Sequence, residues 1–450
     1  MRLSALKIRA GARLTNITSA SAFVTTSYTC QYIVRFHEVI MTYSKRKSTS
    51  VQFTSKNYNE YSLQVARWFL MPIGIWSQIN TATKIKRFFS YVHIFVSTFI
   101  TAIVTVPFLL YVLLEEEDNE IKLNAIGPLS HWIMGMINYC LLLACSSDIR
   151  ECMRHMEMDW RLIKKFEDRQ VMLQQAKIGR FVCGICAIFM QSGTFIFVIT
   201  KSLTTAIVIV GNETISMHLM VCPIYSKFID TRFSPANEIM QVVEMISTFI
   251  VNSVTVGICS LDTIFAMHAY AQLSVLFSWL NKLIVDKDDK NYCVEQRLAI
   301  IVKHHLRVLS FISRMESIMQ SICLVELLGC TMNMCLPAYY FITNLNTFDA
   351  IKLASFVIIY LAMAFNVFVF CYIGEILTEQ CKNVGEKAYM INWYELPHET
   401  ALGLILIIAR SNNVIRLTAG KLFQLSVATF GDIIKTSMVY LNMLRTMNPS

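Results

Sequence analysis

The stretch FFSYVHIFVSTFITAIVTVPFLLYVL, residues 88–113, contains no aspartate, glutamate, lysine or arginine. A helix that crosses the hydrocarbon core of a bilayer needs about 20 mostly apolar residues, so this stretch is long enough to span a membrane. Further stretches of similar length and character lie at 125–146, 179–200, 238–261, 318–341, 353–376 and 426–446. The sequence therefore predicts an all-α membrane protein with seven transmembrane helices.

The composition supports lipid as the solvent of this chain. Of its 450 residues, 55% are hydrophobic and 16% are charged, whereas soluble domains carry about 25% charged residues. The apolar residues gather in long runs between short charged stretches. A separate run, LGLILIIA at 402–409, is too short to span and predicts a helix packed within the protein.

Lysine and arginine lie mostly on one side of the predicted membrane. The segments before the first span and after the second, fourth and sixth hold 33 of them, and the opposite segments hold 6. Cytoplasmic loops carry such an excess, so the N-terminus is predicted to be cytoplasmic and the C-terminus extracellular. G-protein-coupled receptors have the opposite orientation. The net charge of +9 therefore reflects topology rather than nucleic-acid binding.

The N-terminal segment and the long outer loop carry further signals. Residues 1–40 are basic and almost without acids, as in a mitochondrial transit peptide; we favour a disordered or gene-model extension, with 41–87 as the cytoplasmic N-terminal segment. Asn212 opens an Asn-Glu-Thr sequon and could be glycosylated. Cys222 could form a disulfide, whereas most other cysteines lie inside apolar runs and are expected to be packing residues.

Motifs of catalysis are missing from the sequence. No GxSxG, HExxH or glycine-rich phosphate loop occurs, so neither an enzyme nor a bound cofactor or metal is expected. His304 and His305 are neighbours on a predicted helix, where successive side chains point about 100° apart. With Lys303 and Arg307 beside them, they favour a solvated cytoplasmic helix face over a metal site.

Polar residues inside the predicted spans are costly and are candidates for function. For Glu244 in the fourth span, a place in a ligand cavity and a hydrogen bond to a neighbouring helix are equally open. Glu326 in the fifth span belongs to the same class. Asp432 and Lys435 in the seventh span share a helix face and can neutralise each other, so we favour an ion pair over a gating role for them.

The end of the seventh span, SMVYLNMLRTM at 437–447, has a mixed face. It carries Met443 and Met447, with Ser437 and Tyr440 below them. If several copies of this helix surrounded an axis, the polar residues would line a pore. The methionines would narrow its outer end, and such a constriction can gate by dewetting. Plain helix packing of the methionines is the alternative.

Two long C-terminal stretches resemble insect odorant receptors. They are LTAGKLFQLSVATFGDIIKTSMVYLNMLRTM (417–447) and FVFCYIGEILTEQCKNVGEKAYMINWYELP (368–397). The resemblance continues, in the same order along the chain from Met41 onward, in SLQVARWFLMPIGIW (62–76), SPANEI (234–239), HAYAQL (268–273) and the histidine pair at 304–305. The first of these motifs along the chain, SLQVARWFLMPIGIW, is most similar to receptors of ants, bees and their relatives.

The resemblance implies an odorant-specific subunit of a heteromeric, ligand-gated, non-selective cation channel. It would lie in the plasma membrane of olfactory sensory neurons, without a G protein, and pair with the odorant receptor co-receptor in a heterotetramer around one pore. The last helix, 426–447, would line that pore, with the gate at Met443 and Met447. The cytoplasmic ends of spans four to seven would form an anchor region of subunit contacts, roughly 270–315 and 376–425.

The resemblance also implies an odorant pocket in the outer halves of spans two, three, four and six, within 88–375. The ligand would be a small volatile or a hydrocarbon, so aromatic and methionine side chains with few polar groups suit the wall. The wall residues that we expect are Trp132, Met136, Gln191, Thr194, Phe197, Met240, Glu244 and Tyr360. Plain helix packing is the alternative for each aromatic residue.

Two other classes of protein remain as alternatives. An insect gustatory receptor would share the fold and the topology. That family ends on a Thr-Tyr-x-x-x-x-x-Gln-Phe pattern, whereas this chain reads Ser437-Met-Val-Tyr440 and closes on Leu-Arg-Thr-Met. A multi-spanning transporter would call for inverted repeats or helices broken near the midplane, and the sequence has no visible internal repeat. We therefore prefer the odorant receptor.

Overall fold

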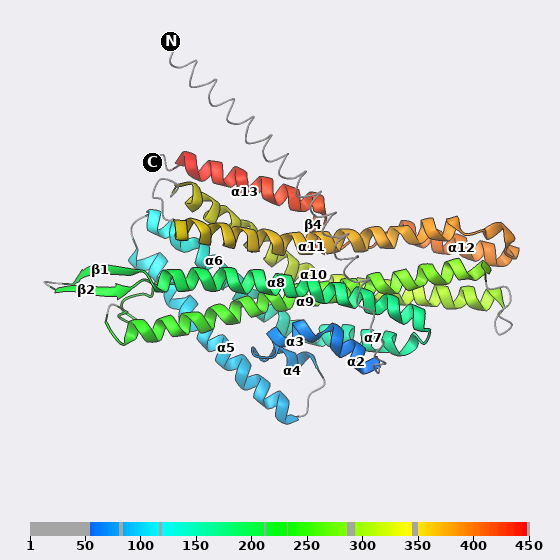
Figure 1. Ribbon diagram of the computed structural model, residues 1–450, viewed down its shortest axis with the longest axis horizontal. Helices are drawn as coiled ribbons and strands as arrows, with labels where there is room; N and C mark the ends of the chain where they lie inside the picture. The colour runs from blue at the N-terminus through cyan, green and yellow to red at the C-terminus, as the bar shows by residue number, and fades with distance from the viewer. Residues whose placement is uncertain are drawn as a thin grey trace, which may run out of the picture.

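The computed structural model describes residues 55–80, 84–116, 119–210, 213–231, 233–285, 293–343 and 350–447. Long helices run side by side and form an elongated bundle, with a β-hairpin at one end and α12 (His398–Asn412) at the other (Figure 1). We call these the hairpin end and the α12 end. Residues 1–40 and Asn212, for which the sequence suggests an extension and a glycosylation site, lie outside the described residues.

The bundle is built from helices of very different length. In chain order, they begin with α2 (Ser55–Ser62), α3 (Gln64–Leu70), α4 (Ile75–Ile79), α5 (Lys84–Leu110), the π-helical turn η1 (Tyr111–Glu115), α6 (Asn119–Ala144), α7 (Ser146–Leu162) and α8 (Phe166–Ser202). They continue with α9 (Ala236–Val285), α10 (Val294–Thr343), α11 (Ala350–Met390), the short 3-10 helix η3 (Trp393–Glu395), α12 and α13 (Val427–Met447). Both α9 and α10 have 50 residues. At 1.5 Å per residue each is about 75 Å long, so both project well beyond a hydrocarbon core of about 30 Å.

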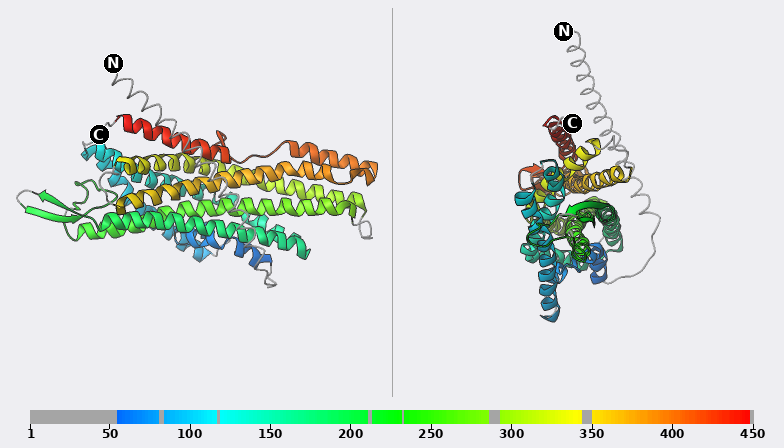
Figure 2. Two further views of the ribbon diagram at one scale, coloured as in Figure 1. Left: turned by 45° about the horizontal axis from the view of Figure 1, so that its top comes forward. Right: turned by 90° about the vertical axis from the view of Figure 1, so that its left-hand side faces the viewer.

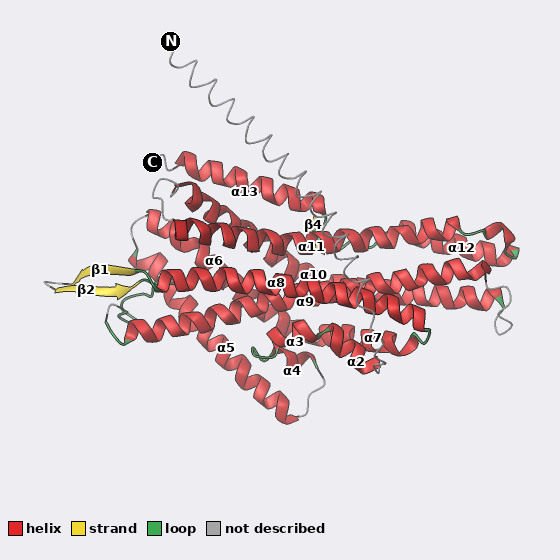
Figure 3. Cartoon of the chain, in the orientation of Figure 1, coloured by secondary structure: helices red, strands yellow, loops and turns green. Residues whose placement is uncertain are grey.

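The described residues form two small hairpins, and the larger one projects from one end of the bundle as two yellow arrows (Figure 3). At the hairpin end, β1 (Thr205–Val210) pairs antiparallel with β2 (Glu213–His218), and Thr205 lies opposite His218. The sequence TAIVIV of β1 is rich in β-branched residues, which favour strands. Before α13, β3 (Thr418–Ala419) pairs with β4 (Phe423–Gln424) across a turn that contains Gly420 in the left-handed region, at φ 62°. Neither hairpin is expected from the sequence.

The central helix of the bundle is α9. It contacts α3, α5, α6, α8, α10 and α11, and the end-on view shows helices on all sides of it (Figure 2). Glycine permits the closest of these contacts: a Cβ at Gly257 would lie 2.4 Å from Leu70 of α3. In contrast, α5 leaves Phe88, Phe95 and Phe99 exposed. An apolar surface of this kind suits lipid.

Six described helices are long and apolar enough to cross a membrane. These candidate spans are Lys84–Glu115, Ala125–Ala144, Phe166–Ser202, Ala236–Leu283, Val294–Tyr339 and Leu353–Met390. They contain the first six predicted spans almost completely, so the chain is an all-α membrane protein. The seventh predicted span forms α13, but this helix, which carries Asp432 and Lys435, is not among the six.

The run 402–409 lies inside α12, so the predicted helix is confirmed. Proline precedes its first residue, Glu399 lies in its first turn and Arg410 in its last, which suits the helix dipole. Leu404 and Ile407 are buried, whereas Leu406 is 72% exposed. The predicted packing within the protein therefore holds for one face of α12 and not for the other.

Candidate ligand cavity and pore helix

A cavity of about 560 Å³ lies at the hairpin end, between α6, α8, α10 and α11. Its size is within the range of about 300–1,000 Å³ that small-molecule sites occupy. The helices contribute Tyr111, Ile121, Ala125, Gly127, Pro128, His131, Trp132, Thr194, Phe197, Lys201, Asn333, Leu336, Pro337, Phe356, Ile359 and Met363 to the wall. The loop after β2 adds Leu219, Met220, Val221 and Pro223 to the wall.

Two prolines shape the wall. Pro128 lies inside α6 and Pro337 inside α10, and a proline within a helix removes one backbone hydrogen bond and bends the axis. Next to Pro128, a Cβ on Gly127 would lie 3.2 Å from Cδ1 of Leu336, so the two helices approach closely there. The cavity therefore forms where α6 and α10 are locally irregular.

Hydrogen bonds fix the aromatic part of the wall. The Trp132 indole N–H donates to the Ser247 hydroxyl of α9 at 2.8 Å. The neighbouring His131 ring places Nε2 3.1 Å from Oδ1 of Asn252, also on α9. Since an amide oxygen accepts, Nε2 is the donor in this arrangement. Both rings are thus anchored on the central helix and cannot swing freely into the cavity.

Glu244 of α9 holds the loop that lines one side of the cavity. Its side chain is 3% exposed, and Oε1 accepts a hydrogen bond from the backbone N–H of Cys222 at 3.1 Å. Val221 and Pro223, on either side of Cys222, are wall residues. Glu244 therefore contacts a loop, which neither of the two interpretations from sequence includes. Cys222 is a free thiol, so it forms no disulfide within the described part of the chain.

The structure brings three of the eight predicted wall residues to the cavity, namely Trp132, Thr194 and Phe197. Four others lie elsewhere. Met136 faces a separate space of about 20 Å³, and Gln191 Nε2 lies 3.5 Å from the Ser253 hydroxyl. Met240 is buried outside the wall, and Tyr360 lies beside Ser437 of α13. Glu244, the eighth, holds the loop after β2. Spans two, three and six line the cavity, as the resemblance implies, whereas α10 stands in the place expected for the fourth span.

The prediction from sequence does not include several wall residues. Tyr111, Asn333 and Met363 come from η1, α10 and α11, and Lys201 comes from the last turn of α8. A sequence signal exists for His131, because it interrupts the apolar run of the second span. No comparable signal marks the loop residues 219–223, which have no helical or strand periodicity.

Contacts with α11 position the beginning of α13. The carboxylate of Glu375 in α11 accepts a hydrogen bond from the first backbone N–H of α13, that of Val427, at 2.6 Å. Ser426 caps the helix, since its hydroxyl accepts the N–H of Thr429 at 3.1 Å. One turn along, the ring of Phe430 meets that of Phe368 edge to face, with 5.5 Å between centroids. The first turn of α13, which we call its root, is thus fixed to α11.

The predicted pore residues follow one another along α13. Ser437 is buried, whereas Tyr440 and Met443 are 45% and 49% exposed. Met447 is the last residue of α13, and its side chain lies outside the described part of the chain. Asp432 and Lys435 approach to 3.4 Å at the exposed surface, as expected for an ion pair at this spacing. Half of Met443 is therefore available to a partner.

A buried ion cluster joins three helices toward the α12 end. Asp159 of α7 accepts hydrogen bonds from His268 Nε2 of α9 at 3.0 Å and from Arg307 Nε of α10 at 2.5 Å. His155 Nε2 lies 3.8 Å from the same carboxylate. Burial would raise the pKa of Asp159, but the hydrogen bond from His268, with His155 and Arg307, holds that pKa below its usual value. Burial lowers the pKa of His155 by more than Asp159 raises it.

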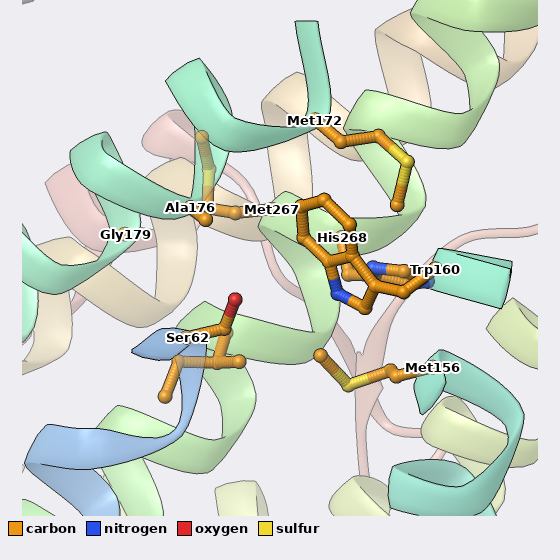
Figure 4. A pocket seen from close by; sticks show the side chains of 9 residues that line it. Ser62, Met156, Trp160, Met172, Ala176, Gly179, Met267 and His268 are labelled. Carbon is orange, nitrogen blue, oxygen red and sulfur yellow. The ribbon is translucent and has the colours of Figure 1, made fainter. Parts of the chain in front are cut away.

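Little space is left beside this cluster. A cavity of about 10 Å³ lies against His268, Trp160 and Met156 (Figure 4), which is room for about one water molecule. The expected solvated face at His304 and His305 is wrong: His305 is 3% exposed, and His304 Nε2 lies 3.1 Å from the Gln272 carbonyl. The reason is tertiary packing: α9 covers His304, and α12, which carries Arg410, lies beside His305.

Comparison with known families adds the decisive observation. The profile of the 7tm Odorant receptor family matches residues 119–438, which is well over half of the chain. The chain belongs to the 7tm odorant receptor family. Odorant receptor 10 of Aedes albopictus is 23% identical over 222 residues, and Odorant receptor 82a of Drosophila melanogaster is 23% identical over 215 residues. Each alignment covers 48% of this chain, and 57% and 54% of the two relatives, so the chain matches about half of their length.

The fold of the family agrees with these matches. The insect olfactory receptor OR5 from Machilis hrabei superposes with a TM-score of 0.66 at 16% identity, over 86% of this chain and 100% of that one. The same receptor in complex with eugenol gives a TM-score of 0.67. At this identity the likeness shows the odorant receptor fold, and the ligand of that receptor stays a property of that receptor.

Proposed function

We propose that this chain is the odorant-specific subunit of a heteromeric, ligand-gated, non-selective cation channel. The observation that carries the proposal is the loop-lined cavity of about 560 Å³, with mostly apolar walls, inside a member of the odorant receptor family. A small volatile or hydrocarbon ligand can bury most of its surface there. Tryptophan and phenylalanine supply the apolar contact, and anchoring of Trp132 keeps the site preformed.

The proposed topology has seven spans, a cytoplasmic N-terminus and an extracellular C-terminus. The excess of lysine and arginine, 33 against 6, supports it, and it puts the hairpin end and the cavity outside. As a multi-pass protein of the plasma membrane of olfactory sensory neurons, the chain would meet volatile ligands at that end. The cluster around Asp159 would then lie on the cytoplasmic side.

In this proposal α13 is the seventh span and one wall of a central pore. Its low hydropathy is expected if one face of the helix meets water rather than lipid. Tyr440 would line the lower pore, and Met443 and Met447 would form the apolar constriction. Ser437, which the sequence also suggests for the pore, is buried beside Tyr360 of α11 and faces away from the pore. The exposed Met443, at 49%, fits a residue that neighbouring subunits approach.

The partner in this proposal is the odorant receptor co-receptor, in a heterotetramer. The uncovered face of α12 supports a subunit contact there: Leu402, Ile405 and Leu406 are 50%, 57% and 72% exposed. Apolar side chains gathered beyond the membrane are expected to be covered by protein. Tyr394, 70% exposed in η3, extends the same region.

The direct test is to record from cells that express this chain with the co-receptor. We expect odorant-evoked currents carried by both sodium and potassium, and no such current from cells that express the co-receptor alone. Silence of the pair across a broad panel of volatiles, with both chains detected at the surface, would contradict the proposed function.

The gate has its own test. Shortening Met443 or Met447 to alanine widens an apolar constriction, so we expect more current without odorant or a larger evoked current. Met438→Ala, on the same helix outside the predicted gate, is the matched control and should leave both currents unchanged. If Met443→Ala and Met447→Ala both conduct like wild type, the gate lies elsewhere.

A further inference from the structure

A buried carboxylate joins three helices in the middle of the bundle. Glu326 of α10 is 1% exposed, and its Oε1 accepts a hydrogen bond from the Asn138 amide of α6 at 2.8 Å. Its Oε2 accepts one from the Asn366 amide of α11 at 3.3 Å. Both asparagines are fully buried. We call these three residues the Glu326 hub.

Burial of the Glu326 carboxyl group costs free energy. The amide N–H groups of Asn138 and Asn366 satisfy one oxygen each, but the carboxyl group is still held away from water. No lysine, arginine or histidine forms an ion pair with Glu326 within the described part of the chain. Acidic residues of this kind inside a membrane bundle are rare and are functional candidates. Packing alone would be served as well by apolar side chains.

The hub lies directly below the cavity. On α11, Met363 is a cavity wall residue, and Asn366 follows it three positions later. On α10, the wall residue Asn333 follows Glu326 by seven positions. Residues at these spacings share one face of a helix. A ligand that displaces the wall of α11 therefore displaces the residue that holds Glu326.

The same helix, α11, also holds the root of α13. It runs without a break from Met363 past Asn366 to Glu375, which accepts the backbone N–H of Val427. Between them, Phe368 packs on Phe430. A shift or rotation of α11 at the hub must therefore move the first turn of α13.

We propose that the Glu326 hub locks α6, α10 and α11 together in the closed channel, and that ligand in the cavity releases this lock. Released, α11 moves and carries the root of α13 with it, which opens the pore. Glu326 and Asn366 act here as positioning residues, because neither lines the cavity wall. The inference rests on the proposed function and adds to it the element that couples ligand and pore.

The test is the current that flows without any odorant. We expect Asn366→Ala and Glu326→Gln to raise this current per surface receptor, and to lower the odorant concentration for half-maximal current, by about fivefold or more, the low end of couplings between sites. A residue with a merely structural role would lower the current when removed. The double variant Glu326→Gln/Asn366→Asp exchanges acid and amide across the same contact, and we expect it to return the odorant-free current toward wild type.

Glu157→Gln is the matched control, because Glu157 forms a pair with Arg161 at the surface of α7, far from the cavity. Unchanged odorant-free current in Asn366→Ala and Glu326→Gln, at equal surface amounts, would overturn the proposal. If Glu326→Gln does not reach the cell surface, Asn366→Ser is measured instead, because it shortens only one hydrogen-bond donor. An odorant-free current equal to that of wild type in Asn366→Ser also overturns the proposal. A wild-type chain that answers no odorant contradicts the proposed function instead, and the odorant-free current of the variants still decides the role of the hub.

Discussion

The two ends of the bundle differ in the partners of their buried polar groups and in the empty space beside them. At the hairpin end, neutral groups such as His131 and Trp132 are hydrogen-bonded to α9 around an open space of about 560 Å³. Toward the α12 end, the charged Asp159 is enclosed by His268 and Arg307, and the space beside them is about 10 Å³. A charge enclosed by partners fixes the helices that carry it, whereas neutral pairs around a void leave room for a guest. We therefore assign stability to the α12 end and, under the proposed function, ligand exchange to the hairpin end.

The largest effect should come from breaking the ion cluster. Asp159→Ala leaves Arg307 and His268 buried without their acceptor, which costs about 3–5 kcal/mol. We expect a much lower unfolding temperature for the purified full chain in detergent. Glu157→Ala, which removes an exposed partner of Arg161 on the same helix, should change stability by about 1 kcal/mol at most. Equal unfolding temperatures for the two variants would show that the cluster does not fix the α12 end.

A smaller effect should follow from freeing the loop that lines one side of the cavity. Glu244→Ala leaves the buried N–H of Cys222 without its acceptor, at a cost of about 1–3 kcal/mol. The loop should open more often, so odorant-evoked current should decay faster after washout, by about fivefold or more. Glu238→Ala, an exposed acid in the first turn of α9, is the control. Decay at the wild-type rate in Glu244→Ala would mean that ligand leaves by another route.

The smallest effect concerns pH. The pKa of His155 is lowered by burial, so as the pH falls below about 6.5 the unfolded chain binds a proton before the folded chain does. The free energy of unfolding should therefore decrease as the pH falls below about 6.5, by at most about 1.4 kcal/mol per pH unit. Asp159, whose folded pKa is depressed, contributes stability that is lost later, as the pH falls through that pKa.

This dependence is measured as the unfolding temperature of wild type and His155→Gln at about pH 7.5 and about pH 5.5. The variant should lose less stability on acidification than wild type. His398→Gln, at the exposed start of α12, should behave like wild type. Parallel curves for wild type and His155→Gln would remove His155 from the pH response.

Much of the fold follows from local sequence. The six long spans are apolar enough to be read directly, and α12 was predictable because its apolar run is too short to cross a membrane. The β1–β2 hairpin was not predictable from helix periodicity. His304 and His305 were misassigned to a solvated face because tertiary packing, which no local pattern shows, covers them.

The cavity could be predicted only in part: spans two, three and six line it as expected, whereas α10 stands in the place expected for the fourth span. Trp132, Thr194 and Phe197 lie at its level, whereas Met136 and Gln191 lie about one turn deeper, where the helices close on each other. Nothing in the sequence says where a gap between helices ends. Glu244 was recognised as unusual because it is an acid in an apolar span, but its partner, Cys222, comes from a loop with no periodic pattern.

The bond from Val427 to Glu375 has a consequence for how such receptors can be recombined. The first N–H of α13 donates to a carboxylate of α11. A last helix transferred from a relative therefore keeps its matched acceptor only if α11 is transferred with it. Chimeras between relatives should fold when the junction precedes Ala350 and fail when it falls between α11 and α13. The two helices should thus be exchanged together, although more than thirty residues separate the end of one from the start of the other.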